Sequence, residues 1–103
     1  MFVRVAEAGK PAFQLRKGEE GLSVFDTEAV NPLVSDAEIL DAFRAESRLI
    51  SRSREEIEVK GLIVVPVLGG PSLPSRLREA HAEIRRSPNM TRGQFKKALQ
   101  ELE

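Results

Sequence analysis

The sequence contains no cysteine, no tryptophan and no tyrosine, and its single histidine is His81. Without cysteine, disulfide scaffolds, zinc fingers and thiol catalysis are all excluded. A zinc site built on one histidine would depend on carboxylates, so we expect no metal site. The only aromatic residues besides His81 are five phenylalanines. We therefore expect a small core made mainly of aliphatic side chains.

Long hydrophobic runs are also missing. The longest apolar stretch is Leu62–Leu68 (LIVVPVL), far below the roughly 20 residues that a membrane-spanning helix needs. The first ten residues carry Arg4 and Glu7 and lack the apolar middle of a signal peptide. We expect a cytoplasmic location where the protein is made, no membrane partner, and one domain over residues 1–103. Secretion without a cleaved signal stays open.

Charge is balanced in total but not along the chain. Lysine plus arginine and aspartate plus glutamate both number 16. Residues 19–58 hold eleven acids against four arginines, a net of −7, and residues 76–97 hold seven bases against two acids, a net of +5. The balanced total and the shortage of stacking aromatics argue against a nucleic-acid partner. The two charged regions either face each other or solvate the surface, or the basic region attracts an anionic ligand or an acidic partner.

Hydrophobic periodicity predicts a mixed α+β fold with small, mostly antiparallel sheets and two helices. Alternating apolar residues predict strands at residues 2–6 and 22–25. Ser35 and Glu38 have the spacing of a capping box and predict a helix over about 36–48. Thr91 and Gln94 have the same spacing and predict a helix over about 92–102.

Two segments between these helices need a further decision. Residues 57–68, rich in valine and isoleucine with Gly61 inside, predict the central strand, bent or interrupted at the glycine; residues 51–56 before it are a loop or a frayed turn. Residues 75–86 have helical spacing and high helix propensity. Propensity therefore favours a helix there, ended by Pro88.

Common catalytic and phosphate-binding motifs are absent. No GxSxG surrounds a serine, and neither GxGxxG nor GxxxxGK[ST] occurs. Three other segments, in this order, resemble small bacterial toxin domains of the ADP-ribosyltransferase-like fold, and most closely the type VI secretion effector group and its solo relatives. They are VRV at residues 3–5, GLSVFD at residues 21–26 and HAEIRRSPNMTRGQFKKAL at residues 81–99.

The resemblance implies a toxin-like domain that binds NAD between two short sheets, with ADP-ribosyl transfer or NAD cleavage as its activity. It implies that Arg4 holds a phosphate or ribose and that Ser23 supports the pocket near the nicotinamide ribose. His81 reaches in from a later strand over about 80–86, with residues 72–77 as a loop or short turn. Glu83 is the nearest candidate for the catalytic glutamate. A cognate inhibitor protein is an implied partner.

A hypothesis of a different class stays open beside this one. In it the domain is a non-catalytic interaction module whose basic C-terminal third binds an acidic partner, including the acidic half of a second copy in a homodimer. Such binding weakens as salt is added. The two hypotheses differ in what they require around Arg4, Ser23 and His81: a concave pocket for an enzyme, and a flat surface for a module.

Overall fold

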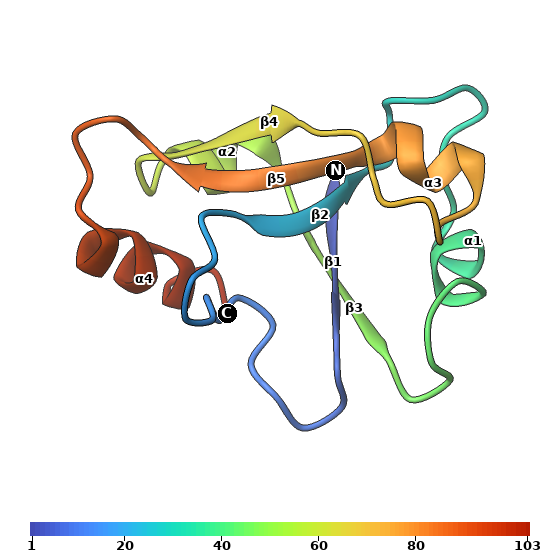
Figure 1. Ribbon diagram of the computed structural model, residues 1–103, viewed down its shortest axis with the longest axis horizontal. Helices are drawn as coiled ribbons and strands as arrows, with labels where there is room; N and C mark the ends of the chain where they lie inside the picture. The colour runs from blue at the N-terminus through green and yellow to red at the C-terminus, as the bar shows by residue number, and fades with distance from the viewer.

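A computed structural model describes residues 1–103 as one five-stranded sheet with helices against both faces (Figure 1). The elements in chain order are β1 (Phe2–Ala6), β2 (Leu22–Asp26), α1 (Asp36–Leu40), β3 (Arg48–Arg52), α2 (Arg54–Glu58), β4 (Leu62–Pro66), α3 (Ser75–Ala80), β5 (His81–Arg86) and α4 (Arg92–Gln100). The strand order is β3-β1-β2-β5-β4, and all neighbouring strands are antiparallel. The α+β prediction is confirmed, but there is one sheet and there are four helices instead of two.

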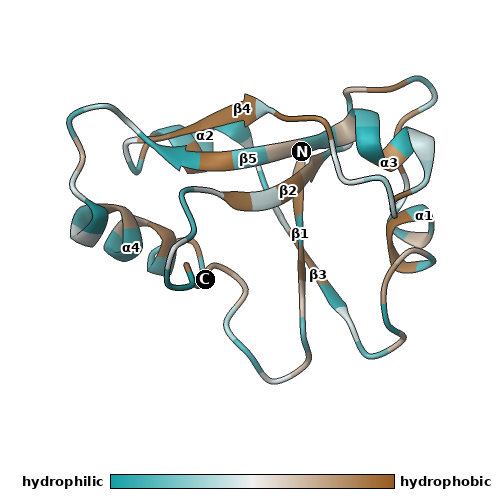
Figure 2. Ribbon diagram, viewed as in Figure 1, coloured by the Kyte–Doolittle hydropathy of each residue, from teal (hydrophilic) through white to brown (hydrophobic).

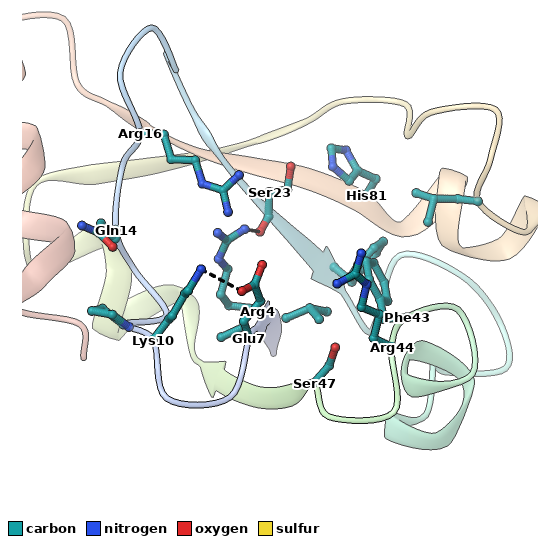
Figure 3. Close-up of a pocket in the computed structure, with 15 residues that line it drawn as sticks. Arg4, Glu7, Lys10, Gln14, Arg16, Ser23, Phe43, Arg44, Ser47 and His81 are labelled. Carbon is teal, nitrogen blue, oxygen red and sulfur yellow. Dashed lines mark hydrogen bonds and ion pairs between the residues drawn. The ribbon is translucent and has the colours of Figure 1, made fainter.

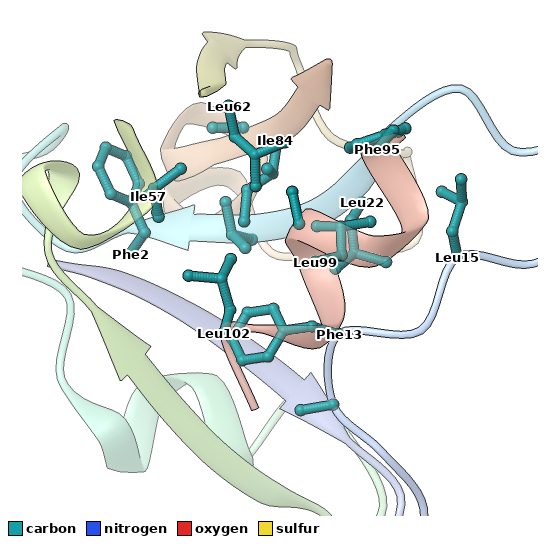
Figure 4. Close-up of a cluster of buried hydrophobic side chains, with 14 of the residues drawn as sticks. Phe2, Phe13, Leu15, Leu22, Ile57, Leu62, Ile84, Phe95, Leu99 and Leu102 are labelled. Carbon is teal, nitrogen blue, oxygen red and sulfur yellow. The ribbon is translucent and has the colours of Figure 1, made fainter. Parts of the chain in front are cut away.

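Each face of the sheet carries its own hydrophobic cluster, because successive residues of a strand point to opposite faces. On one face Leu22 and Ile84 pack with Phe95 and Leu99 of α4 (Figure 4). On the other face Phe25 and its neighbours pack against α1 and α3. Figure 2 shows the matching pattern, with hydrophobic and hydrophilic stretches alternating along β5 and α4.

The sheet opens between β1 and β2. These strands pair through only two residue pairs, Phe2 with Asp26 and Val3 with Phe25, whereas β1 pairs with β3 through five. Beyond Val3 the two strands separate, and Figure 1 shows β1 running away from β2. The end of β1 and the start of β2 are therefore not paired with each other. The candidate site lies at this opening.

The predicted helix over 36–48 is wrong in its length. Ser35 does cap α1, since its hydroxyl accepts a hydrogen bond from the Glu38 N–H, but α1 ends at Leu40. Residues 48–52 instead form β3, which pairs with β1 along its whole length. Pairing with a neighbouring strand outweighs local helix propensity here. Phe43, freed from the helix, packs edge-on against Phe25 with ring centroids 5.9 Å apart.

The predicted central strand over 57–68 is also wrong in its extent and place. Ser53 and Glu56 form a capping box that starts α2, so Ile57 is a buried helical residue. Gly61 takes a positive φ of 80° at the turn that follows, which suits glycine because it lacks a Cβ. The strand that remains is β4, at the edge of the sheet. An edge place suits Pro66, which has no N–H to donate to a neighbour.

Residues 75–86 combine both predictions for this segment. Ser75–Ala80 is the helix that propensity favours, and His81–Arg86 is the strand that the resemblance implies. The prediction that residues 72–77 form a loop or short turn is wrong over 75–77. The last helix is confirmed at Arg92–Gln100, with the Thr91 and Gln94 capping box in place.

Candidate functional site

A cavity of about 510 Å³ lies where β1 and β2 separate (Figure 3). Arg4, Ser23 and His81, which come from three separate segments of the chain, all line it. We call it the basic cavity because its charged wall consists of four basic residues and one acid: Arg4, Lys10, Arg16, Arg44 and Glu7. With the histidine neutral, the net charge of the wall is +3.

Arg4 bridges the gap between the separating strands. Its Nε donates to the Ala12 carbonyl at 2.8 Å, and its Nη1 donates to the Ser23 carbonyl at 2.9 Å. Burial lowers the pKa of Arg4 from its ordinary value, while the nearby Glu19 raises it. The guanidinium stays protonated, because arginine keeps its charge in proteins. Arg4 is thus a structural bridge as well as a basic group of the cavity wall.

His81 begins β5 directly after α3. Its Nδ1 lies 2.8 Å from the Val67 carbonyl oxygen. A carbonyl only accepts, so Nδ1 must carry a proton, and in the neutral ring the lone pair is on Nε2. The ring packs edge-on against Phe25, with centroids 5.8 Å apart. The backbone of the β4–α3 connection therefore fixes the tautomer and leaves Nε2 free to accept a hydrogen bond.

Glu83 does not line the basic cavity. It pairs in register with Ser23 and points to the same face of β5 as His81, two residues earlier. Its Oε1 accepts hydrogen bonds from both Nε and Nη2 of Arg85, at 3.0 and 2.8 Å. The two candidate catalytic residues are therefore separated: His81 lies in the cavity wall, and Glu83 lies beside Ser23 with its carboxylate bound to Arg85.

Four residues of the wall were not predicted from the sequence: Lys10, Arg16, Phe43 and Arg44. They lie between regular elements, where periodicity carries no information. Neither Arg16 nor Arg44 belongs to any ion pair of the molecule. For Lys10 and Arg16 the only signal in the sequence is the presence of bases in the glycine- and proline-bounded segment before β2, and no signal marks Phe43 and Arg44.

The one acid of the wall is already engaged. Glu7 Oε2 lies 2.9 Å from the Lys10 ammonium. The hydrogen bond from Lys10 lowers the pKa of Glu7 from its usual range, so this carboxylate is ionised at neutral pH. Glu7 is thus an internal counter-ion within a wall that is otherwise cationic.

Several bases of the C-terminal third are bound within the chain. Arg76 lies 2.7 Å from the Glu38 carboxylate, and Arg86 lies 3.8 Å from that of Glu20. Arg92 donates to the carbonyls of Arg16 and Glu19. Some of the basic side chains of residues 76–97 therefore bind residues elsewhere in the same chain. Fewer free bases remain for the interaction module that the sequence left open.

None of the four helices has the length and hydrophobicity of a membrane-spanning segment. No group of three or more histidine, aspartate or glutamate side chains is placed to hold a metal ion. Comparison of the chain with protein-family models, with curated proteins and with solved structures gives no match. The assignment of function therefore depends on the basic cavity itself.

Proposed function

We propose that this domain binds NAD in the basic cavity, with the phosphates of the dinucleotide among its arginines. The observation that carries the proposal is the pair Arg16 and Arg44. Both guanidiniums line the cavity, and neither forms an ion pair within 4 Å of a carboxylate. Unpaired charges on a cavity wall favour an anionic ligand.

The placement of the bases suits a diphosphate. Figure 3 shows Lys10 and Arg16 on one side of the cavity and Arg44 on the other, with Arg4 between them. A guanidinium presents its N–H groups in a planar fork that matches two phosphate oxygens at once. A diphosphate within the cavity would therefore meet bases from both sides.

The wall also has an apolar part for a flat ring. Phe25, Phe43 and Leu73 line the cavity beside His81. Ligand sites commonly combine such an apolar surface with a few polar groups that set orientation. Here the His81 ring packs edge-on against Phe25, and its free Nε2 suits a ribose hydroxyl of the ligand.

The catalytic part of the proposal requires a carboxylate close to the bond that breaks. Breaking the bond between nicotinamide and ribose leaves a cationic centre, which a carboxylate stabilises. Glu7 is the one carboxylate in the wall, and Glu83 lies outside it. We keep ADP-ribosyl transfer or NAD cleavage through His81 and Glu83 as a prediction, together with a toxin-like effect of that activity. The assay is release of nicotinamide from NAD, compared between the wild type and Glu83→Gln.

The binding proposal is tested by calorimetric titration of NAD into the wild type, Arg16→Ala and Arg44→Ala. A charge-assisted hydrogen bond contributes about 1.5–3 kcal/mol, and solvent reduces this at an open site. We therefore expect Kd to rise about tenfold in each variant. Lys96→Ala, which removes one exposed charge outside the cavity, is the control and should bind like the wild type. Absence of binding to the wild type would refute the proposal.

A further inference from the structure

We infer that Glu103 is a positioning residue of the basic cavity. Its carboxylate holds residues 7–21, which we call the cavity segment, in the conformation that places Lys10, Gln14 and Arg16 on the wall. Glu103 itself does not line the cavity. The predicted effect of Glu103 on ligand affinity rests on the proposed function. Its effect on the conformation of the cavity segment does not.

Both oxygens of the Glu103 carboxylate are used. Oε1 accepts from the Ala12 N–H at 2.9 Å, and Oε2 accepts from the Phe13 N–H at 2.6 Å. Ala12 and Phe13 are each only 1% exposed, so their N–H groups need an acceptor within the protein. A carboxylate bound by two neighbouring N–H groups makes stronger hydrogen bonds than a neutral acceptor does.

The backbone of Ala12 is also bound by a group of opposite charge, the guanidinium of Arg4. The Ala12 carbonyl accepts from Nε of Arg4 at 2.8 Å, while the Ala12 N–H donates to Glu103. A carboxylate from beyond α4 and a guanidinium from β1 thus bind the backbone of one residue. Arg4 is itself part of the cavity wall, so the C-terminal region is linked directly to the site.

The cavity segment depends on such contacts because it contains no helix or strand. Other side chains support it on either side of Ala12 and Phe13. Arg48 donates to the Lys10 carbonyl at 2.6 Å, and Arg92 donates to the carbonyls of Arg16 and Glu19 at 2.9 and 2.6 Å. Glu103 is the one acidic residue outside the segment whose side chain accepts from its backbone. Its removal would leave the middle of the segment without its acceptor.

Loosening the segment should weaken ligand binding, because binding would then have to order it first. Lys10 and Gln14 lie within two residues of the pair Ala12 and Phe13, and Arg16 lies three residues after Phe13. All three side chains would lose their fixed place on the wall together.

The test compares Glu103→Gln with Glu101→Gln in the full chain. The amide at position 103 retains one acceptor oxygen but faces the other N–H with an NH₂ group that cannot accept. Glu101 lies two residues earlier, pairs with Lys60 at 3.7 Å and makes no hydrogen bond to the cavity segment, so it is a matched control. Two quantities are measured: amide hydrogen exchange at Ala12 and Phe13 by NMR, and the Kd for pyrophosphate by calorimetry.

We expect Glu103→Gln to exchange these two amides at least tenfold faster and to raise the Kd for pyrophosphate at least threefold. Glu101→Gln should stay within twofold of the wild type in both. Glu103→Asp, which keeps the carboxylate, should recover part of both losses. Unchanged exchange in Glu103→Gln, or equal effects of the two glutamine variants, would overturn the inference.

Two further outcomes separate this inference from the proposed function. Faster exchange with unchanged affinity would show that Glu103 holds the segment without positioning the site, which overturns the positioning role. A wild type that binds neither pyrophosphate nor NAD would refute the proposed function and the binding consequence. The exchange rates would still decide whether Glu103 holds the segment.

Discussion

Replacing Arg4 with alanine should destabilise the fold, whether or not a ligand is present. The guanidinium donates to the carbonyls of Ala12 and Ser23 across the opening between β1 and β2. Ala12 is buried, so its carbonyl would lose a hydrogen-bond donor that water does not easily replace. Net contributions of hydrogen bonds to a charged donor are about 1.5–3 kcal/mol each and do not simply add. We expect a loss of about 2–3 kcal/mol in the free energy of unfolding.

For a domain of this size each kcal/mol lowers Tm by about 4–8 °C, so Arg4→Ala should melt about 8–24 °C below the wild type by calorimetry. Arg4→Lys keeps the charge but carries it on one ammonium, which has no planar fork to span two carbonyls, and it should lose about half as much. Arg16→Ala is the control, because Arg16 lines the same cavity but forms no ion pair. It should change Tm by less than about 2 °C. A similarly small change in Arg4→Ala would refute the bridging role.

Three further predictions concern single residues. Glu7→Gln removes the counter-ion of Lys10, so the affinity for pyrophosphate should rise about fivefold at low salt, and calorimetry at rising salt should show the gain decline; no gain would contradict the cationic character of the site. Thr91→Ala removes the cap of α4 and should cost about 1 kcal/mol in urea unfolding, while an unchanged midpoint would show that the cap is not needed. The hydrogen bond from Arg76 lowers the pKa of Glu38, so this pair stabilises the fold above the usual glutamate pKa of about 4.3 and is lost as pH falls through the lowered value. Glu38→Gln should therefore be less stable at pH 7 and lose less stability on acidification, and parallel pH profiles would contradict this.

Local signals in the sequence were sufficient for some elements. Thr91 with Gln94 marks the start of α4, and alternating apolar residues mark β1 and β2. These signals act within one element, since a cap or a period of two residues needs no distant partner.

Other elements depend on contacts that a sequence pattern does not contain. The segment over 48–52 is a strand because it lies along β1, and Glu38 binds Arg76 instead of completing a capping box at Ser35. The isoleucine and valine content of residues 57–68 suggested a central strand, although the Ser53 cap and Gly61 divide the segment into α2 and edge strand β4. Long-range pairing and turn geometry decide such cases.

The cavity illustrates the same division. Arg4, Ser23 and His81 could be selected through a resemblance, because they lie on strands with recognisable neighbours. Lys10 and Arg16 lie in an irregular segment whose backbone is bound by distant side chains such as Glu103. Arg44 lies in the irregular connection between α1 and β3. A sequence pattern contains no information on such long-range contacts, so it could not predict that these three residues line one cavity.

The central claim, that the basic cavity binds NAD, is tested most directly by NMR titration of NAD into the uniformly labelled wild type. We predict saturable shift changes in the backbone amides of residues 10–16, at Ser23 and Arg44, and in the His81 ring. Shift changes confined to another surface, or no change at millimolar NAD, would contradict the account.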